Sequence, residues 1–166
     1  MRYTIGPMVL LILLRVTSAE AELANTTSVS VCALLGSLGL AAGPWRNIYG
    51  NEYGCNSPYK DIGSGIAVGM KNNLAYYVDG SRDFVNQAKL VLNVNDRSQA
   101  QTAHAALIAA SEELSAKIAG GKLLQSTKIS IAAGNSSKAQ IGKSTIEVKR
   151  DDWPTGKGYE LHVIFK

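Results

Sequence analysis

The most regular pattern of hydrophobic and polar positions lies in residues 88–121. Its first seven residues alternate between apolar side chains and a second set that includes Lys89 and Asn93, which predicts a half-buried β-strand. Beyond residue 102, apolar residues recur at spacings of three and four, so they lie along one stripe of a helix. These positions are Ala103, Leu107, Ala110, Leu114 and Ile118.

Both ends of this predicted helix carry the expected signals. Asp96 or Ser98 can cap its start, because a short side-chain oxygen accepts hydrogen bonds from the N–H groups of the first turn. Gly120-Gly121 supplies the left-handed residue at which many helices end. We therefore predict a buried strand followed by a long helix over Arg97–Ala119.

Further alternating segments predict an antiparallel sheet. Leu74–Val78 is typical of a strand that forms a hairpin with the strand after it. Near the C-terminus, Gly142-Lys143 suits a two-residue hairpin turn with glycine at its first position. The strands that follow carry Ile146 and Val148, and then Tyr159, Leu161, Val163 and Phe165.

Two shorter segments complete the prediction. Val29–Ala42 indicates a core helix that ends before Pro44, and Leu123–Ala133 fits either a strand or a short helix, of which we favour the helix. The fold class is then α+β. It has an antiparallel sheet of about five strands, with the long helix and one or two shorter helices on one face.

The N-terminus has the pattern of a secretory signal peptide over residues 1–21. A positive Arg2 precedes an apolar run, Met8–Leu14, and cleavage is expected after Ala19 or Ala21. The run is too short to span a membrane, and a short uncleaved anchor is the alternative. We therefore expect a single domain over residues 22–166, without a transmembrane segment, in a periplasmic or secreted protein.

Two cysteines, Cys32 and Cys55, remain in this domain. An even number of cysteines in an exported protein indicates a disulfide bond. A thiolate metal site would require two further ligands nearby, which the sequence does not offer, so we expect no metal.

Residues 45–80 are the least regular part of the sequence and read as a long loop tethered by the disulfide. Tyrosine and tryptophan among small polar residues are typical of recognition surfaces. The alternative is that these aromatic residues fold back over the core. The candidate binding residues are Trp45, Tyr49, Tyr53, Tyr59, Tyr76 and Tyr77.

The charge of the chain is unevenly distributed. Residues 22–115 contain six Lys and Arg against eight Asp and Glu, whereas residues 116–166 contain nine against four. This asymmetry favours a protein partner or an anionic envelope polymer, although solvated lysines give the same pattern. We expect no nucleic-acid partner, and the oligomeric state stays open.

Few residues suggest catalysis or a cofactor. Residues 142–145 match the end of a phosphate-binding loop, but Ser137 stands where that loop needs glycine, so no cofactor is expected. His104 lies at the edge of the helix stripe, where we expect a hydrogen-bonded boundary histidine. The acid–base candidates are Asp61, Asp151, Asp152 and His162.

Three functions follow from these features. The leading hypothesis is an exported non-catalytic binding protein, inhibitor or envelope accessory that recognises its partner through residues 45–80. The alternatives are a cell-wall polymer hydrolase that uses the acid–base candidates, and an assembly subunit that pairs through a sheet edge. Asn25 and Asn135 match glycosylation acceptors, which matter only in a eukaryotic host, whereas we favour a bacterial one.

Overall fold

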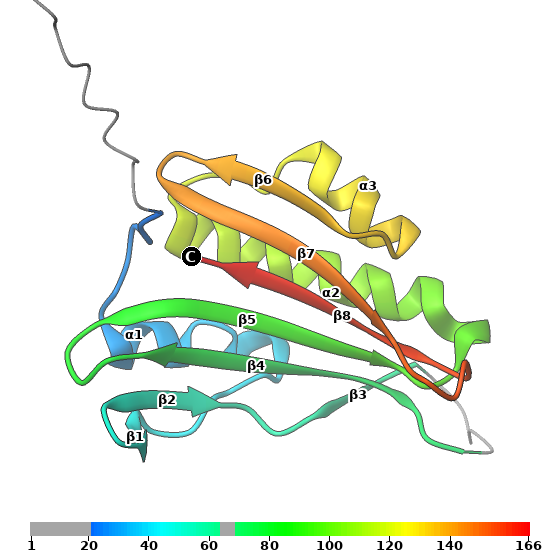
Figure 1. Cartoon of the computed structure of the whole chain (residues 1–166), viewed down its shortest axis with the longest axis horizontal. Helices are drawn as coiled ribbons and strands as arrows, with labels where there is room; N and C mark the ends of the chain where they lie inside the picture. Colours follow the sequence, from blue (N-terminus) through cyan, green and yellow to red (C-terminus); the bar gives the residue numbers. More distant parts are fainter. Residues whose placement is uncertain (1–20, 64–68) are drawn as a thin grey trace, which may run out of the picture.

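A computed structural model describes residues 21–63 and 69–166 (Figure 1). Apart from Ala21, the predicted signal peptide lies outside these ranges. The described residues form one antiparallel sheet of eight strands in the order β1-β2-β4-β5-β8-β7-β6, with β3 paired beside β2 on the same edge of β4. The strands are β1 (Arg46–Tyr49), β2 (Glu52–Asn56), β3 (Lys60–Ile62), β4 (Asn72–Gly80), β5 (Val85–Val94), β6 (Ser137–Ile141), β7 (Ser144–Asp152) and β8 (Tyr159–Phe165).

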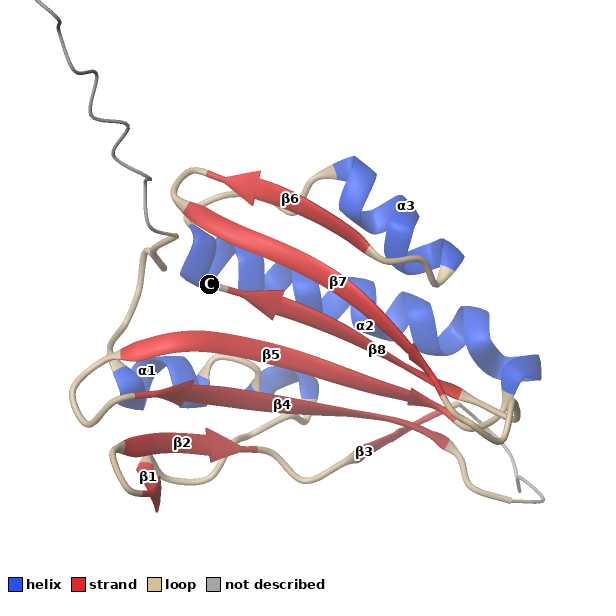
Figure 2. Ribbon diagram, viewed as in Figure 1, coloured by secondary structure: helices blue, strands red, loops and turns tan. Residues whose placement is uncertain are grey.

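The helices leave one face of the sheet uncovered. In Figure 2, α1 (Ser28–Ala33) and α2 (Ala100–Leu114) lie behind the strands, so the reader looks onto the helix-free face. A third helix, α3 (Gln125–Ala133), contacts α2, β6 and β7. Single 3₁₀ turns precede α2 at Arg97–Gln99 and follow α1 at Gly36–Leu38, and a π-helical turn, Ser115–Ala119, extends α2.

The core lies between the helices and the covered face of the sheet. Strand alternation places every second side chain of β4, β5, β7 and β8 toward the helices. The apolar stripe of α2 packs against them, because a helix with spacings of three and four presents one face. Leu90, Leu107, Leu114, Leu161 and Phe165 are all completely buried there.

Several predictions are confirmed. The α+β class and the helix over Arg97–Ala119 are present, with the side chain of Asp96 accepting a hydrogen bond from the Ser98 amide at its start. Strands β4 and β5 form the predicted hairpin. Gly142 has a φ of 57° in the two-residue turn between β6 and β7, as such a turn requires of its first residue. Residues 123–133 contain a helix, α3.

The prediction of about five strands was wrong. Strands β1, β2 and β3 lie in the segment that we read as a loop. They occupy the edge of the sheet, and all four side chains of β1 are exposed. An edge strand that buries few side chains needs no apolar alternation, and that alternation is the signal by which strands are recognised in a sequence.

The predicted helix Val29–Ala42 is also corrected. Only six residues, Ser28–Ala33, are α-helical, and the chain then tightens into the 3₁₀ turn that ends at Gly39. Gly39 has a φ of 72°, a left-handed conformation that stops a helix. The apolar residues of this segment are buried as predicted, but in irregular backbone: Leu35 and Leu40 are 0% and 1% exposed.

Candidate functional site

Four of the six candidate binding residues lie along the edge formed by β1, β2 and β3, whereas Tyr76 and Tyr77 lie on the adjoining strand β4. Cys32 and Cys55 form the predicted disulfide, with 6.1 Å between their Cα atoms. The bond joins α1 to β2, so the edge strands are fixed to the helical layer. Strands β1, β2 and β3 therefore extend the sheet where we predicted a loop.

Trp45 and Tyr53 form a stacked pair at this edge, with 6.5 Å between ring centroids. Arg82, from the turn between β4 and β5, holds the pair in place. Its carbonyl oxygen accepts a hydrogen bond from the Trp45 indole at 3.2 Å, and its guanidinium donates to the Tyr53 hydroxyl at 3.2 Å. The sequence gives no signal for Arg82, because the contact depends on pairing between distant strands.

Tyr59 and Tyr77 lie on the helix-free face. Their hydroxyl groups are 3.0 Å apart, and the Lys89 ammonium lies 5.2 Å from the centre of the Tyr77 ring. Burial, and then the hydrogen bond with Tyr59, raise the pKa of the Tyr77 hydroxyl above its ordinary value. The Tyr77 hydroxyl is therefore a neutral hydrogen-bonding group at physiological pH.

The remaining two candidates have opposite environments. Tyr76 is 0% exposed, and its hydroxyl donates to the carbonyl oxygen of Val31 at 2.9 Å. Burial raises the pKa of this hydroxyl as well. Tyr76 therefore belongs to the core, whereas Tyr49 is 80% exposed at the end of β1.

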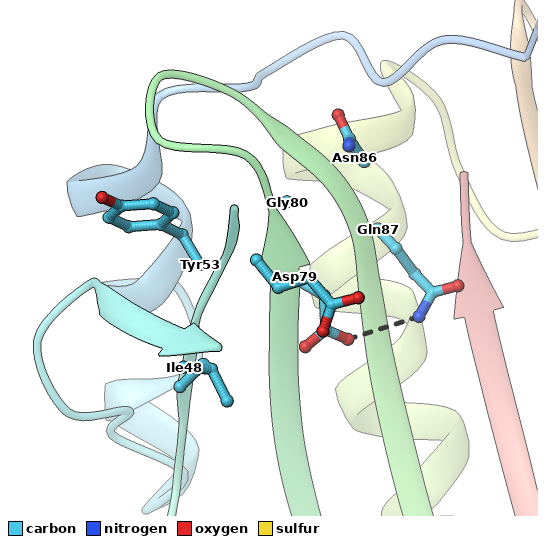
Figure 3. A pocket seen from close by; sticks show the side chains of 7 residues that line it. Ile48, Tyr53, Asp79, Gly80, Asn86 and Gln87 are labelled. Atoms are coloured by element: carbon cyan, nitrogen blue, oxygen red, sulfur yellow. Dashed lines mark hydrogen bonds between the residues drawn. The ribbon is translucent and has the colours of Figure 1, made fainter. Parts of the chain in front are cut away.

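A pocket of about 420 Å³ opens beside Tyr53, at the edge of the sheet (Figure 3). Four strands line it, and both of its charged groups are carboxylates, Glu52 and Asp79. Gln87 donates a hydrogen bond to Asp79 at 3.4 Å, and no ion pair within the described part of the chain involves either carboxylate. The remaining lining residues are Ile48, Tyr53, Gly80 and Asn86.

Figure 3 shows how these side chains are directed. Asp79 and Gln87 approach each other across β4 and β5, and Ile48 lies on the side of β1 and β2. The ring of Tyr53 points away from Asp79, and it stacks on Trp45 outside this view. The pocket thus offers carboxylate and amide acceptors, together with the aliphatic side chain of Ile48, which is 55% exposed.

The acid–base candidates are separated by the alternation of β7. Asp151 pairs in register with Glu160, and Asp152 with the buried Tyr159, so the two carboxylates lie on opposite faces. Asp151 accepts a hydrogen bond from Lys149 at 2.8 Å. Two carboxylates on opposite faces cannot flank one scissile bond.

Histidine 162 and Asp61 also have local partners. His162 is 2.7 Å from Glu160 and 3.9 Å from Asp151, on the helix-free face. Asp61 is 65% exposed and lies 3.9 Å from the Lys71 ammonium. These contacts satisfy each group with its neighbours, and the structure does not bring His162 and Asp61 together.

Two properties bear on other kinds of site. Across residues 21–63 and 69–166, no group of three His, Cys, Asp or Glu residues could hold a metal ion. None of the helices in those ranges combines the length and hydrophobicity needed to cross a membrane. Comparisons with models of protein families, with curated proteins and with solved structures find no match to this chain.

Proposed function

We propose that the chain is an exported, non-catalytic binding protein, an inhibitor or an envelope accessory, that recognises a protein partner through the surface of residues 45–80. The observation that carries this proposal is the pocket of about 420 Å³ beside the fully exposed strand β1. A concave pocket of this size with a few convergent polar groups is the default hypothesis for a binding site.

The rigidity of the surface supports the same function. Its side chains come from paired strands fixed by the Cys32–Cys55 disulfide and by the Trp45–Tyr53 stack. A preorganised surface loses less conformational entropy when it binds. Ile48 and Tyr49, which are 55% and 80% exposed, are available as apolar anchors.

The charge of the pocket bears on whether the partner is a protein or an anionic envelope polymer. Glu52 and Asp79 would repel an anionic envelope polymer, because like charges at close range are unfavourable. A protein with a complementary polar surface fits this site better. We therefore favour a protein partner over a polymer.

Export is part of the proposal and has two supports. Disulfides persist in oxidising compartments, and this chain has one that joins two elements of its fold. The first 21 residues have the pattern of a signal peptide. These two features support a periplasmic or secreted location.

The test compares two exposed isoleucines. Ile48→Ser removes the aliphatic wall of the pocket, and Ile129→Ser makes the same change on α3, where Ile129 is 60% exposed and distant from the pocket. Crosslinking in a native envelope extract, followed by mass spectrometry, should identify a partner that Ile129→Ser retains and Ile48→Ser loses. Equal recovery with both variants would rule against recognition through this surface.

The alternative of assembly through a sheet edge also has a specific support. Strand β6 ends the sheet on the side opposite β1, and its five residues pair with β7 without a register shift. A regular terminal strand can accept another strand. This function predicts oligomers that grow with concentration on a sizing column, and a strict monomer would contradict it.

A further inference from the structure

A second pocket, of about 200 Å³, lies between β3, α2 and the 3₁₀ turn Gly36–Leu38. Its walls are aliphatic apart from one side chain, Lys60. Leu40 and Leu74 form the floor and are 1% and 2% exposed. The pocket is therefore an apolar hollow that reaches the buried core.

The helix side of this pocket consists of alanines. Ala106, Ala109 and Ala110 line it, whereas Leu107 and Leu114 of the same helix are completely buried in the neighbouring core. Protein interiors are normally packed to high density, so the space beside these three small side chains is unusual. An apolar group of a ligand can occupy it.

Lys60 places one positive charge at the opening. Its ammonium donates a hydrogen bond to the Leu38 carbonyl oxygen at 2.6 Å, and its final methylenes lie along Gly39, 3.5 Å from where a β-carbon would stand. An ammonium has three donors, so two remain. In the described ranges, no carboxylate forms an ion pair with Lys60.

The nearby acidic groups have other partners. Glu113 of α2 pairs with Lys117 at 2.6 Å, and Asp61 pairs with Lys71. Asp61 follows Lys60 in β3 and therefore points to the opposite face of the sheet. The charge at the mouth of the pocket is consequently positive.

We propose that this pocket binds the alkyl chain of a free single-chain carboxylate, with the head group beside the Lys60 ammonium. At ~30 Å³ per methylene, close to the liquid volume of a water molecule, the pocket holds about six or seven carbons. A medium-chain carboxylate fits this volume, and a two-chain lipid does not. Lys60, Ile62 and Leu74 of this pocket lie within residues 45–80, but the proposal does not depend on the protein partner proposed for that surface.

The test is an NMR titration of the isotope-labelled protein with octanoate and, separately, with octan-1-ol. Octanoate should shift the amide signals of Leu38, Ile62 and Ala106 in a saturable manner. Lys60→Met should weaken octanoate about fivefold, the effect of one charge pair near 4 Å in water, and should leave octanol unchanged.

Filling the pocket gives the second arm of the test. Ala109→Leu places a larger side chain in the lining at an exposed position, and should weaken both compounds at least tenfold. Ala106→Leu repeats the change at a deeper position. Ala105→Leu is the matched control, since Ala105 is exposed on α2 outside the pocket.

Several results would overturn the proposal. The absence of saturable shifts with octanoate would show that no such ligand binds. Unchanged octanoate affinity in both Ala109→Leu and Ala106→Leu would place the chain elsewhere. Equal affinities for octanoate and octanol, unchanged in Lys60→Met, would remove the role of the charge.

Discussion

The imidazole of His104 on α2 and the hydroxyl of Tyr159 on β8 are joined by a hydrogen bond of 2.9 Å at Nε2. The other ring nitrogen, Nδ1, is 3.0 Å from the carbonyl oxygen of Ala132, near the end of α3. Because a carbonyl oxygen only accepts, Nδ1 donates to Ala132, and in the neutral imidazole Nε2 then accepts from Tyr159. His104 thus fixes α2 to both the sheet and α3.

The variant Tyr159→Phe tests this connection. It removes the donor to His104, which is 6% exposed, while the phenyl ring keeps its contact with the Arg150 guanidinium 3.8 Å away. Leaving a buried acceptor without its partner costs about 1–3 kcal/mol. Urea unfolding should show this loss, and Tyr49→Phe at an exposed position should not. Equal stabilities would mean that the hydrogen bond contributes nothing net.

The disulfide provides a second prediction. Replacing both Cys32 and Cys55 by serine should lower the free energy of unfolding by roughly 3 kcal/mol, the chain-entropy value for a loop of this length. Relative to the wild type, the double variant should exchange its amide hydrogens faster in β2, while exchange in β5 changes less. Strand β5 is held between two long strands whatever the state of the disulfide. Uniform loosening of all strands would contradict a local role for the bond.

The aromatic region shows how far the sequence could predict the site. Composition drew attention to residues 45–80, but it could not separate Tyr76 from Tyr77. Adjacent residues on a strand point to opposite faces, and only the buried neighbours of β4 decide which face is the core. The hydroxyl contact between Tyr76 and Val31 spans 45 residues and has no local signal.

The same limit applies to the strands and helices: buried elements were predicted, and an exposed strand was missed. Strand β5 and helix α2 bury a regular stripe and were predicted, because burial imposes a period on the sequence. Strand β1 has four exposed residues and was missed. The pocket lined by Glu52 and Asp79 was also missed, since it forms only when β2 pairs with β4.

The backbone of Gly80 lies so close to the neighbouring strand that a side chain there would clash with it. The register of β4 against β5 shifts between Asp79 and Gly80, and a β-carbon at Gly80 would overlap the Phe84 carbonyl oxygen. Gly80→Ala should therefore destabilise the fold by about 1–3 kcal/mol, as overpacking usually does. Gly36→Ala is the control, because a β-carbon there meets no atom within 4 Å. Thermal unfolding of the two variants at one pH decides the comparison.

The ion pair between Asp152 and Arg150 should make the stability of the fold depend on pH. Hydrogen bonds from the Arg150 guanidinium, the shortest of 2.7 Å, hold the pKa of Asp152 below its ordinary value of 3.8. A carboxyl whose pKa is lower in the folded than in the unfolded state stabilises the fold above its ordinary pKa, and this contribution disappears as the pH falls through the folded value. The contribution is small and sensitive to salt, since both groups are solvated.

Urea unfolding of the wild type and Asp152→Asn therefore tests the pair. The wild type should be the more stable protein near neutral pH, and the difference should shrink as the pH falls from about 4 toward 2. In an Arg150→Met background, Asp152→Asn should cause a smaller pH-dependent difference, because the hydrogen-bond donor has been removed and only the weaker effect of Arg97 on the pKa of Asp152 remains. A difference that persists unchanged at the lowest pH, or is undiminished in that background, would show that Asp152 stabilises the fold through something other than its pairing with Arg150.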